Sequence, residues 1–258
     1  MNLKTLAAAT ALAACFLAAT ARAVDLAAVT EALVHESADG AKLPYRQYLP
    51  RDLPEGTKIP LLLFLHGAGE RGDDNARQLC NGVEKIVAFA DARGIPFAML
   101  VPQCPGPNQW VDTPWSQLSH RMDPEPSMPM RLAMELLEAK IAELPVDPSR
   151  IYVTGLSMGG YGTWDILQRR PGRFAAAIPI CGGGDTTLAW RIRDVPIWAF
   201  HGAADSTVPV SRSRDMVAAL WACDGNIRYR EYPGVGHGSW GPTYQDESVL
   251  EWLFRQHR

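Results

Sequence analysis

Apolar residues fall into alternating strand-like and helix-like patterns along most of this chain. Residues 59–65 (I-P-L-L-L-F-L) form a continuous apolar run, which is typical of a strand buried on both faces. Residues 130–144 place leucines and an isoleucine along one stripe, which predicts an amphipathic helix that Pro145 ends.

The same patterns predict the rest of the secondary structure. Further strands are expected at residues 30–35, 42–49, 97–101, 151–154, 175–180, 196–200 and 227–232, and further helices at 76–90, directly after residue 157, at 211–222 and at 248–254. Strands that alternate with helices predict an α/β fold, with a mostly parallel sheet covered by helices on both faces. The first two strands meet at Asp39-Gly40, a hairpin signal, and suit an antiparallel edge.

The first 23 residues have the pattern of an export leader. A short basic end with Lys4 precedes a small apolar run, and Ala21-Arg22-Ala23 resembles a cleavage site. We therefore expect cleavage after Ala23 and export to the periplasm or the medium, with residues 24–258 forming one catalytic domain and no membrane span. The minority alternative is a lipoprotein that is lipidated at Cys15.

Composition excludes some partners and leaves the cysteines open. The formal net charge is −3 and no basic run is present, so nucleic acid is not an expected partner. Four cysteines follow the leader, and they permit two disulfides in three pairings or four free thiols. Their wide spacing lacks the C-x-x-C pattern of a zinc site, and we predict neither a metal nor a cofactor.

The run I-Y-V-T-G-L-S-M-G-G-Y-G-T-W-D at residues 151–165 places Ser157 in a G-x-S-x-G motif. The motif lies between a strand-like and a helix-like run, which is the setting of a nucleophilic serine on a sharp strand-to-helix turn. Gly155 and Gly159 would let neighbouring backbone approach that turn. We predict that Ser157 is the nucleophile.

A nucleophilic serine needs a histidine base, and that base needs an acid to orient it. His237 lies in the glycine-flanked loop Y-P-G-V-G-H-G-S-W after the last predicted strand and is the predicted base. Asp205 follows the next-to-last strand in W-A-F-H-G-A-A-D-S-T-V-P and is the predicted acid. Its competitors are Asp185, one strand earlier, and Asp215, inside a predicted helix. The chain order of serine, aspartate and histidine is the one expected of α/β-hydrolases.

Attack of a nucleophilic serine on a carbonyl carbon also needs hydrogen-bond donors for the developing oxyanion. One predicted donor is the backbone N–H of Met158, directly after the nucleophile and at the start of its helix. The other is the N–H of Ala68, which Gly67 and Gly69 flank in the loop H-G-A-G-E-R-G-D-D at residues 66–74.

Together these motifs resemble secreted or periplasmic α/β-hydrolase esterases of the polyhydroxybutyrate-depolymerase-like and feruloyl/acetyl-xylan-esterase-like group. The resemblance covers nearly all of residues 25–256 and is carried by L-H-G-A-G-E-R-G at 65–72, P-Q-C-P at 102–105, T-G-L-S-M-G-G-Y-G-T-W at 154–164, P-I-C-G-G-G-D at 179–185, H-G-A-A-D-S-T-V-P at 201–209 and G-V-G-H-G-S-W at 234–240. It implies an α/β-hydrolase fold, the Ser157–Asp205–His237 triad and Ala68 as an oxyanion donor.

The surroundings of the predicted site indicate an open cleft. Only residues 181–195 separate two predicted strands, which is too short for a helical cap, so we expect little or no cap domain. Trp110 and Trp115 in the long segment 102–127, and Trp240 after the predicted base, are expected walls that would suit aryl, sugar-linked or short-chain esters. Core packing is the alternative for each tryptophan.

Three rival functions share parts of this pattern. A serine peptidase like the prolyl oligopeptidase catalytic domain has the same triad and fold, but usually carries a gating domain. A noncatalytic binding module would usually lack a triad member, and none is missing here. Dienelactone-hydrolase-like enzymes place a cysteine where this chain has Ser157. We therefore expect an esterase whose partner is a small-molecule or polysaccharide-linked ester.

Overall fold

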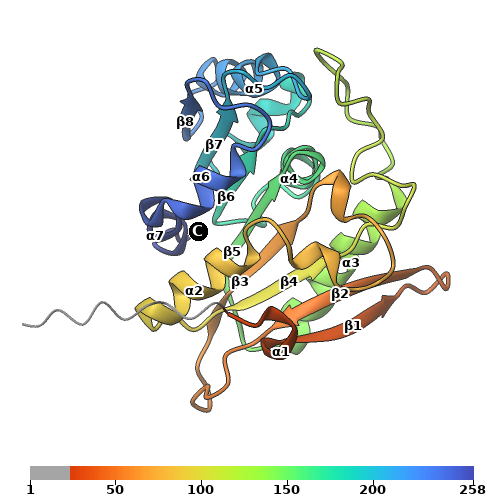
Figure 1. Cartoon of the computed structure of the whole chain (residues 1–258), viewed down its shortest axis with the longest axis vertical. Coiled ribbons are helices and arrows are strands. Elements are labelled where there is room, and N and C mark those ends of the chain that lie inside the picture. The colour runs from red at the N-terminus through yellow and green to blue at the C-terminus, as the bar shows by residue number, and fades with distance from the viewer. Residues whose placement is uncertain (1–23) are drawn as a thin grey trace, which may run out of the picture.

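An eight-stranded sheet runs through the computed structural model, which describes residues 24–258 (Figure 1). The predicted leader, its cleavage after Ala23 and the alternative lipidation of Cys15 lie outside the described residues. Among the described residues, no helix has the length and apolarity needed to cross a membrane.

The strands and helices follow the predicted alternation along the chain. The strands are β1 (Thr30–Glu36), β2 (Lys42–Tyr48), β3 (Ile59–Leu65), β4 (Ala98–Pro102), β5 (Val146–Leu156), β6 (Ala176–Ile180), β7 (Ile197–Gly202) and β8 (Ile227–Tyr232). The α-helices are α1 (Leu26–Val29), α2 (Val83–Arg93), α3 (Met128–Glu143), α4 (Met158–Arg169), α5 (Ser211–Trp221), α6 (Trp240–Gln245) and α7 (Glu247–Phe254). Three short 3₁₀ helices are η1 (Ala68–Glu70), η2 (Arg77–Leu79) and η3 (Thr186–Ile192).

The strand order is β1-β2-β4-β3-β5-β6-β7-β8. The β1–β2 and β2–β4 pairs are antiparallel, and the five pairs from β4 to β8 are parallel. The predicted parallel sheet with an antiparallel edge is therefore confirmed. Because the parallel strands point the same way, the loops after β3, β5, β7 and β8 meet at one edge of the sheet.

Helices cover both faces of the sheet, and β3 shows how its residues divide between them. Leu61, Leu63 and Leu65 pack into the core beneath α3, α4 and α5. Leu62 and Phe64 point to the other face, toward α2, α6 and α7. Successive strand side chains point to opposite faces, so a strand covered on both sides must be apolar at every position.

The structure corrects the predicted helix at residues 76–90. The segment forms η2 at Arg77–Leu79, and the longer helix α2 begins only at Val83 and runs to Arg93. Asn81 and Gly82 have positive φ values of 60° and 128°, which no continuous right-handed helix tolerates. Two smaller differences are the earlier start of β5 at Val146 and the helix α6, which the apolar pattern did not indicate.

The segment between β6 and β7 contains only the short helix η3. Within the part of the chain that the structure describes, no helical cap is inserted there, as expected. The long segment between β4 and α3 instead forms an excursion on one side of the molecule, at the upper right of Figure 1.

Truncating the two-sided core strand should weaken the fold. We expect Leu63→Ala to lower the free energy of unfolding by about 2–5 kcal/mol, because it leaves a cavity where a fully buried side chain packed. Urea denaturation followed by circular dichroism measures the change.

The matched control is Val34→Ala on the edge strand β1, where the side chain is 56% exposed. That variant should shift the free energy of unfolding by no more than about 0.5 kcal/mol. Equal effects of the two substitutions would contradict the assignment of β3 as the centre of the core.

Candidate active site

Ser157 lies at a strained turn between β5 and α4. Its backbone has φ 54° and ψ −117°, a conformation that is unusual for a residue other than glycine. A β-carbon on Gly159 would lie 1.9 Å from the carbonyl oxygen of Leu65, so only glycine allows this approach of α4 to β3. The turn holds the hydroxyl at the tip of the bend.

The loop that carries His237 approaches the end of β7 through a second close backbone contact. A β-carbon on Gly202 would lie 2.1 Å from the carbonyl oxygen of Gly236. The Ala204 N–H donates to the carbonyl of Val235 at 2.9 Å, which joins the loops after β7 and β8. The glycine that follows His201 therefore lets the His237 loop reach the strand ends.

The structure brings the three predicted triad side chains into one chain of hydrogen bonds. His237 Nε2 lies 2.8 Å from Ser157 Oγ, and His237 Nδ1 lies 2.8 Å from Asp205 Oδ2. With the proton on Nδ1 donated to the carboxylate, Nε2 has a lone pair for the serine hydroxyl. This geometry suits a serine, a general base and an orienting acid.

The Asp205 carboxylate is stabilised as an anion. Burial raises its pKa, but hydrogen bonds from His201, His237 and the amides of Val208 and Thr207 outweigh burial and hold the pKa of Asp205 below its ordinary value. His201 is the residue that sequence reasoning missed. Its Nε2 lies 3.3 Å from Asp205 Oδ2, and the H-G pair at the end of β7 was the available signal.

The competing acids lie outside this chain of hydrogen bonds. Asp185 caps η3, accepts from Thr187, and forms an ion pair with Arg121. Asp215 lies within helix α5. Neither carboxylate hydrogen-bonds to His237, which bonds to Asp205 instead.

The two predicted oxyanion donors are both the first residue of a helix. Ala68 begins η1 and Met158 begins α4. Neither N–H donates to an acceptor among the described residues, because the first amides of a helix have no partner within it. Both amides are therefore available to a substrate oxygen, and α4 adds the positive end of its dipole at Met158.

His66 supports the turn that carries Ala68. Its Nε2 accepts from the Cys104 N–H at 2.9 Å, and its Nδ1 lies 2.6 Å from the Gly67 carbonyl. Because Nε2 is an acceptor, the ring proton lies on Nδ1 and is donated to Gly67. Burial lowers the pKa of His66 to about 4, so the ring is neutral at pH 7.

The structure corrects the role predicted for Trp110. Its side chain is fully buried, and its Nε1 donates to the carbonyl of His66 at 3.0 Å. The ring packs edge-on against the His66 imidazole. Trp110 is therefore part of the core beneath the Ala68 turn, and it does not reach an open cleft.

Trp115 is half-buried and lies at the edge of the site. It lines a cavity of about 520 Å³ together with Pro114 and Thr207, and Thr207 donates its amide to Asp205. The Trp115 carbonyl accepts from the Tyr161 hydroxyl at 3.0 Å. This places the tryptophan on the acid side of the site, tied to the helix that follows Ser157.

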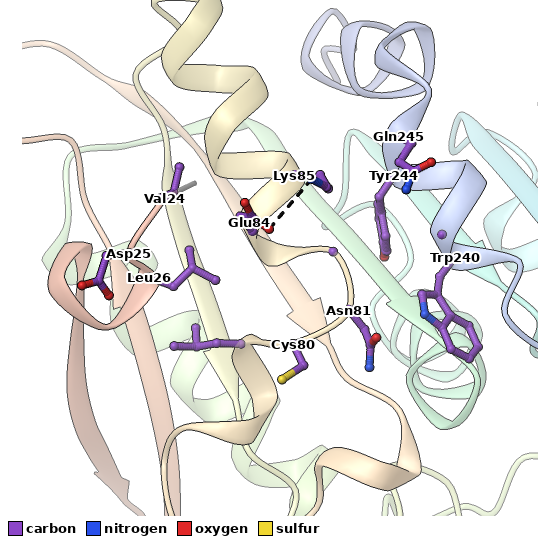
Figure 2. Close-up of a pocket in the computed structure, with 13 residues that line it drawn as sticks. Val24, Asp25, Leu26, Cys80, Asn81, Glu84, Lys85, Trp240, Tyr244 and Gln245 are labelled. Carbon is purple, nitrogen blue, oxygen red and sulfur yellow. Dashed lines mark ion pairs between the residues drawn. The ribbon is translucent and has the colours of Figure 1, made fainter. Parts of the chain in front are cut away.

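Trp240 borders the site on the side of the histidine. Its ring meets the His237 imidazole edge-on, with centroids 5.3 Å apart. It also lines a cavity of about 440 Å³, where Figure 2 shows Trp240 and Tyr244 of α6 beside the turn that carries Cys80 and Asn81. This cavity and the candidate triad therefore share Trp240 as a wall.

All four cysteines of the described residues are free thiols, which is one of the two alternatives that the sequence left open. The Sγ of Cys181, one Asp205 oxygen and one His237 nitrogen lie within 4.8 Å of one another, as three metal ligands would. Burial raises the pKa of Cys181 to about 12, which disfavours the thiolate that binds metals. Asp205 and His237 are already bonded to each other, so this group does not suit a metal ion.

Comparisons with known proteins bear on the family and the fold of this chain. Residues 53–249 match the phospholipase/carboxylesterase family. The crystal structure of a thermostable esterase superposes with a TM-score of 0.83 and 39% sequence identity, over 90% of this chain and 64% of that chain.

Two curated relatives are more distant. An uncharacterized secreted protein of Arthroderma benhamiae is 27% identical over 71% of this chain and 22% of its own length. A bifunctional acetylxylan esterase/xylanase of Neocallimastix patriciarum is 26% identical over 79% of this chain and 29% of its own length. This chain therefore spans less than a third of either relative.

Acid should destabilise the protein through His66. Its pKa is about 4 when folded and 6.5 in the unfolded reference, so the unfolded state binds more protons between these values. Stability from this group is therefore present above pH 6.5 and is lost as the pH falls toward 4, by about 2 kcal/mol between pH 7 and pH 4.5. Urea denaturation at the two pH values measures the loss.

His66→Asn removes the titrating ring while keeping an N–H donor at the position of Nδ1. We expect this variant to be less stable at pH 7, but its stability should change less between pH 7 and pH 4.5 than that of the wild type. His257→Asn, at an exposed position near the C-terminus, should keep the wild-type difference. An unaltered pH dependence in His66→Asn would contradict a neutral buried imidazole.

Proposed function

The chain belongs to the phospholipase/carboxylesterase family of α/β-hydrolases, and from that premise we propose that it is a serine carboxylic-ester hydrolase with Ser157, His237 and Asp205 as its triad. The observation that carries this proposal is the hydrogen-bonded chain from serine through imidazole to carboxylate, with both links at 2.8 Å. No cofactor takes part in the proposed reaction.

In the first half of the reaction, His237 Nε2 takes the proton of Ser157 Oγ as the oxygen attacks the ester carbon. The carbonyl π bond breaks, and its electrons form an oxyanion. The free amides of Ala68 and Met158 support the proposal that this oxyanion is held there, where each donor contributes about 2.7–4 kcal/mol to the transition state.

Collapse of the oxyanion breaks the bond to the alcohol, and His237 gives its proton to the leaving oxygen. Water then attacks the acyl-enzyme as Nε2 takes its proton, and the acid product leaves as Ser157 regains a proton. Asp205 holds the imidazole and stabilises the imidazolium without taking its proton. The low pKa of Asp205 supports this role, because a carboxylic acid with a low pKa remains ionised beside a cation.

The proposed substrates are aryl, sugar-linked or short-chain esters. The absence of a helical cap from the described residues supports access of bulky esters to the site. Trp115 on the acid side and Trp240 on the histidine side offer flat apolar surfaces, which bind aryl groups and the faces of sugar rings. We also propose that the protein is exported after cleavage of residues 1–23.

The alternative is a serine peptidase that uses the same three residues. Amide hydrolysis needs the same nucleophile and oxyanion donors, so this arrangement does not separate the two reactions. Activity on aminoacyl-arylamides without activity on aryl esters would reverse the preference.

Removing the nucleophile should abolish the reaction. We expect Ser157→Ala to lower kcat on p-nitrophenyl acetate by about 10⁶-fold, as in other serine hydrolases that lose the nucleophile. A fluorophosphonate should label the wild type and leave the variant unlabelled, as read by intact mass. A folded wild type that resists labelling would favour a noncatalytic binding protein.

Two esters that differ in their acyl group should show whether Trp115 contacts that group. We expect Trp115→Ala to raise KM for methyl ferulate about tenfold, because an aryl group would lose a contact of about 1.4 kcal/mol. KM for p-nitrophenyl acetate should change little, since an acetyl group has no ring to stack.

Trp221→Ala is the matched control, because that ring is 62% exposed at the end of α5. It should leave both substrates unaffected. If Trp115→Ala also left KM for methyl ferulate unchanged, the cavity beside Thr207 would not hold the acyl group.

A further inference from the structure

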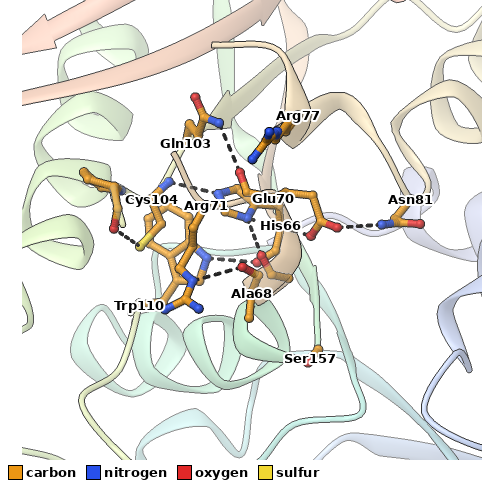
Figure 3. A network of polar contacts seen from close by, with 12 residues as sticks. His66, Ala68, Glu70, Arg71, Arg77, Asn81, Gln103, Cys104, Trp110 and Ser157 are labelled. Carbon is orange, nitrogen blue, oxygen red and sulfur yellow. Dashed lines mark hydrogen bonds and ion pairs between the residues drawn. The ribbon is translucent and has the colours of Figure 1, made fainter. Parts of the chain in front are cut away.

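Arg71 lies directly after the turn that carries the Ala68 amide. Its Nε donates to the Ala68 carbonyl at 2.9 Å, at the same turn that His66 contacts through the Gly67 carbonyl (Figure 3). The peptide on one side of Ala68 is thus held by an imidazole, and the peptide on the other side by a guanidinium.

The other end of the same guanidinium contacts the segment between β4 and α3. This segment carries Trp115, which is the proposed wall of the substrate site. Its Nη1 donates to the carbonyls of Pro107 and Asn108, both at 3.3 Å. Its central carbon lies 5.7 Å from the centre of the Trp115 ring, within the range of a cation–π contact. A single side chain therefore contacts the Ala68 turn, the 107–108 loop and Trp115.

Arg71 forms no ion pair with a carboxylate of the described residues. Among the described residues it has no acidic partner within ion-pair distance, whereas the nearby Arg77 pairs with Asp74. All three of its hydrogen bonds go to backbone carbonyls. A planar guanidinium donates in several fixed directions at once, which the ammonium group of a lysine does not.

A second hydrogen bond attaches Trp115 to the helix that follows Ser157. The Tyr161 hydroxyl donates to the Trp115 carbonyl, and Tyr161 lies on α4 four residues after Ser157. The wall is therefore attached to the nucleophile helix through Tyr161 and to the Ala68 turn through Arg71.

We propose that Arg71 is a positioning residue that sets the Ala68 oxyanion amide and the Trp115 wall in one fixed relation; this inference rests on the proposed esterase function. The same side chain then affects two measurable quantities. Displacement of the Ala68 amide lowers kcat for every ester, whereas displacement of Trp115 raises KM only for esters whose acyl group is large enough to contact it.

The test uses Arg71→Met, which keeps the apolar stem and removes the charge and all donors. We expect kcat to fall about tenfold on both p-nitrophenyl acetate and methyl ferulate, because a misplaced oxyanion donor weakens transition-state stabilisation. KM should rise about fivefold for methyl ferulate alone, the size of a lost cation–π support of the wall.

Two further variants separate positioning from charge. Arg71→Lys keeps the charge and should recover part of kcat, while KM for methyl ferulate stays raised because one ammonium does not bridge both loops. Arg71→Ala should regain part of its kcat/KM in millimolar ethylguanidinium, which refills the vacated position. Ser157→Ala should show no such recovery.

Arg77→Ala is the matched control, since its side chain is 67% exposed and pairs only within its own segment. It should behave as the wild type on both substrates. Titration of active sites with a fluorophosphonate corrects the rates of the wild type and of the Arg71 and Arg77 variants for the folded fraction, so a variant that folds poorly is still compared per active site.

The outcomes distinguish this inference from the proposed function. A wild type without esterase activity overturns both. An active wild type whose Arg71→Met variant keeps kcat and KM within twofold overturns the positioning role alone. Equal changes in KM for both substrates, or no recovery of Arg71→Ala in ethylguanidinium, would likewise exclude the link between the Ala68 turn and the Trp115 wall.

Discussion

The candidate site depends on the close backbone contact between Gly159 at the start of α4 and Leu65 at the end of β3. A larger residue at position 159 would move the helix away from the strand, and the Met158 amide would move with it. The Ala68 turn begins three residues after Leu65. This contact therefore sets the distance between the Ala68 and Met158 amides. It also fixes the position of the strained turn at Ser157 relative to β3.

Two enclosed titratable groups near Ser157, His66 and Asp205, differ in their charge. His66 is fully enclosed beside the Ala68 turn, and burial keeps it neutral, so it acts as a fixed donor to Gly67. Asp205 is also enclosed, yet four hydrogen-bond donors keep it ionised. Burial disfavours charge in both groups, and the number of donors decides which of them remains charged.

The segment between β4 and α3 borders the candidate site, and no helical cap is inserted between β6 and β7 within the described residues. In the segment after β4, Trp110 is buried as support, whereas Trp115 remains half-exposed five residues later. The excursion is attached through Tyr161 to the nucleophile helix and through Arg71 to the turn after β3. The His237 side chain is 23% exposed and therefore reaches solvent, whereas Ser157 is buried at 8% exposure.

Local signals in the amino-acid sequence were enough to predict the sheet, the order of its strands and the residues at the strand ends. Apolar periodicity and glycine positions are local signals, so β3, the turn at Ser157 and the loops that carry Asp205 and His237 were predicted at the right places. Tertiary contacts alone bury Trp110 while leaving Trp115 half-exposed, interrupt the predicted helix at Asn81 and Gly82, and bring His201 to Asp205 as a further donor. These facts depend on contacts between segments far apart in the chain, where the packing space around a side chain, and not its type, decides what it does.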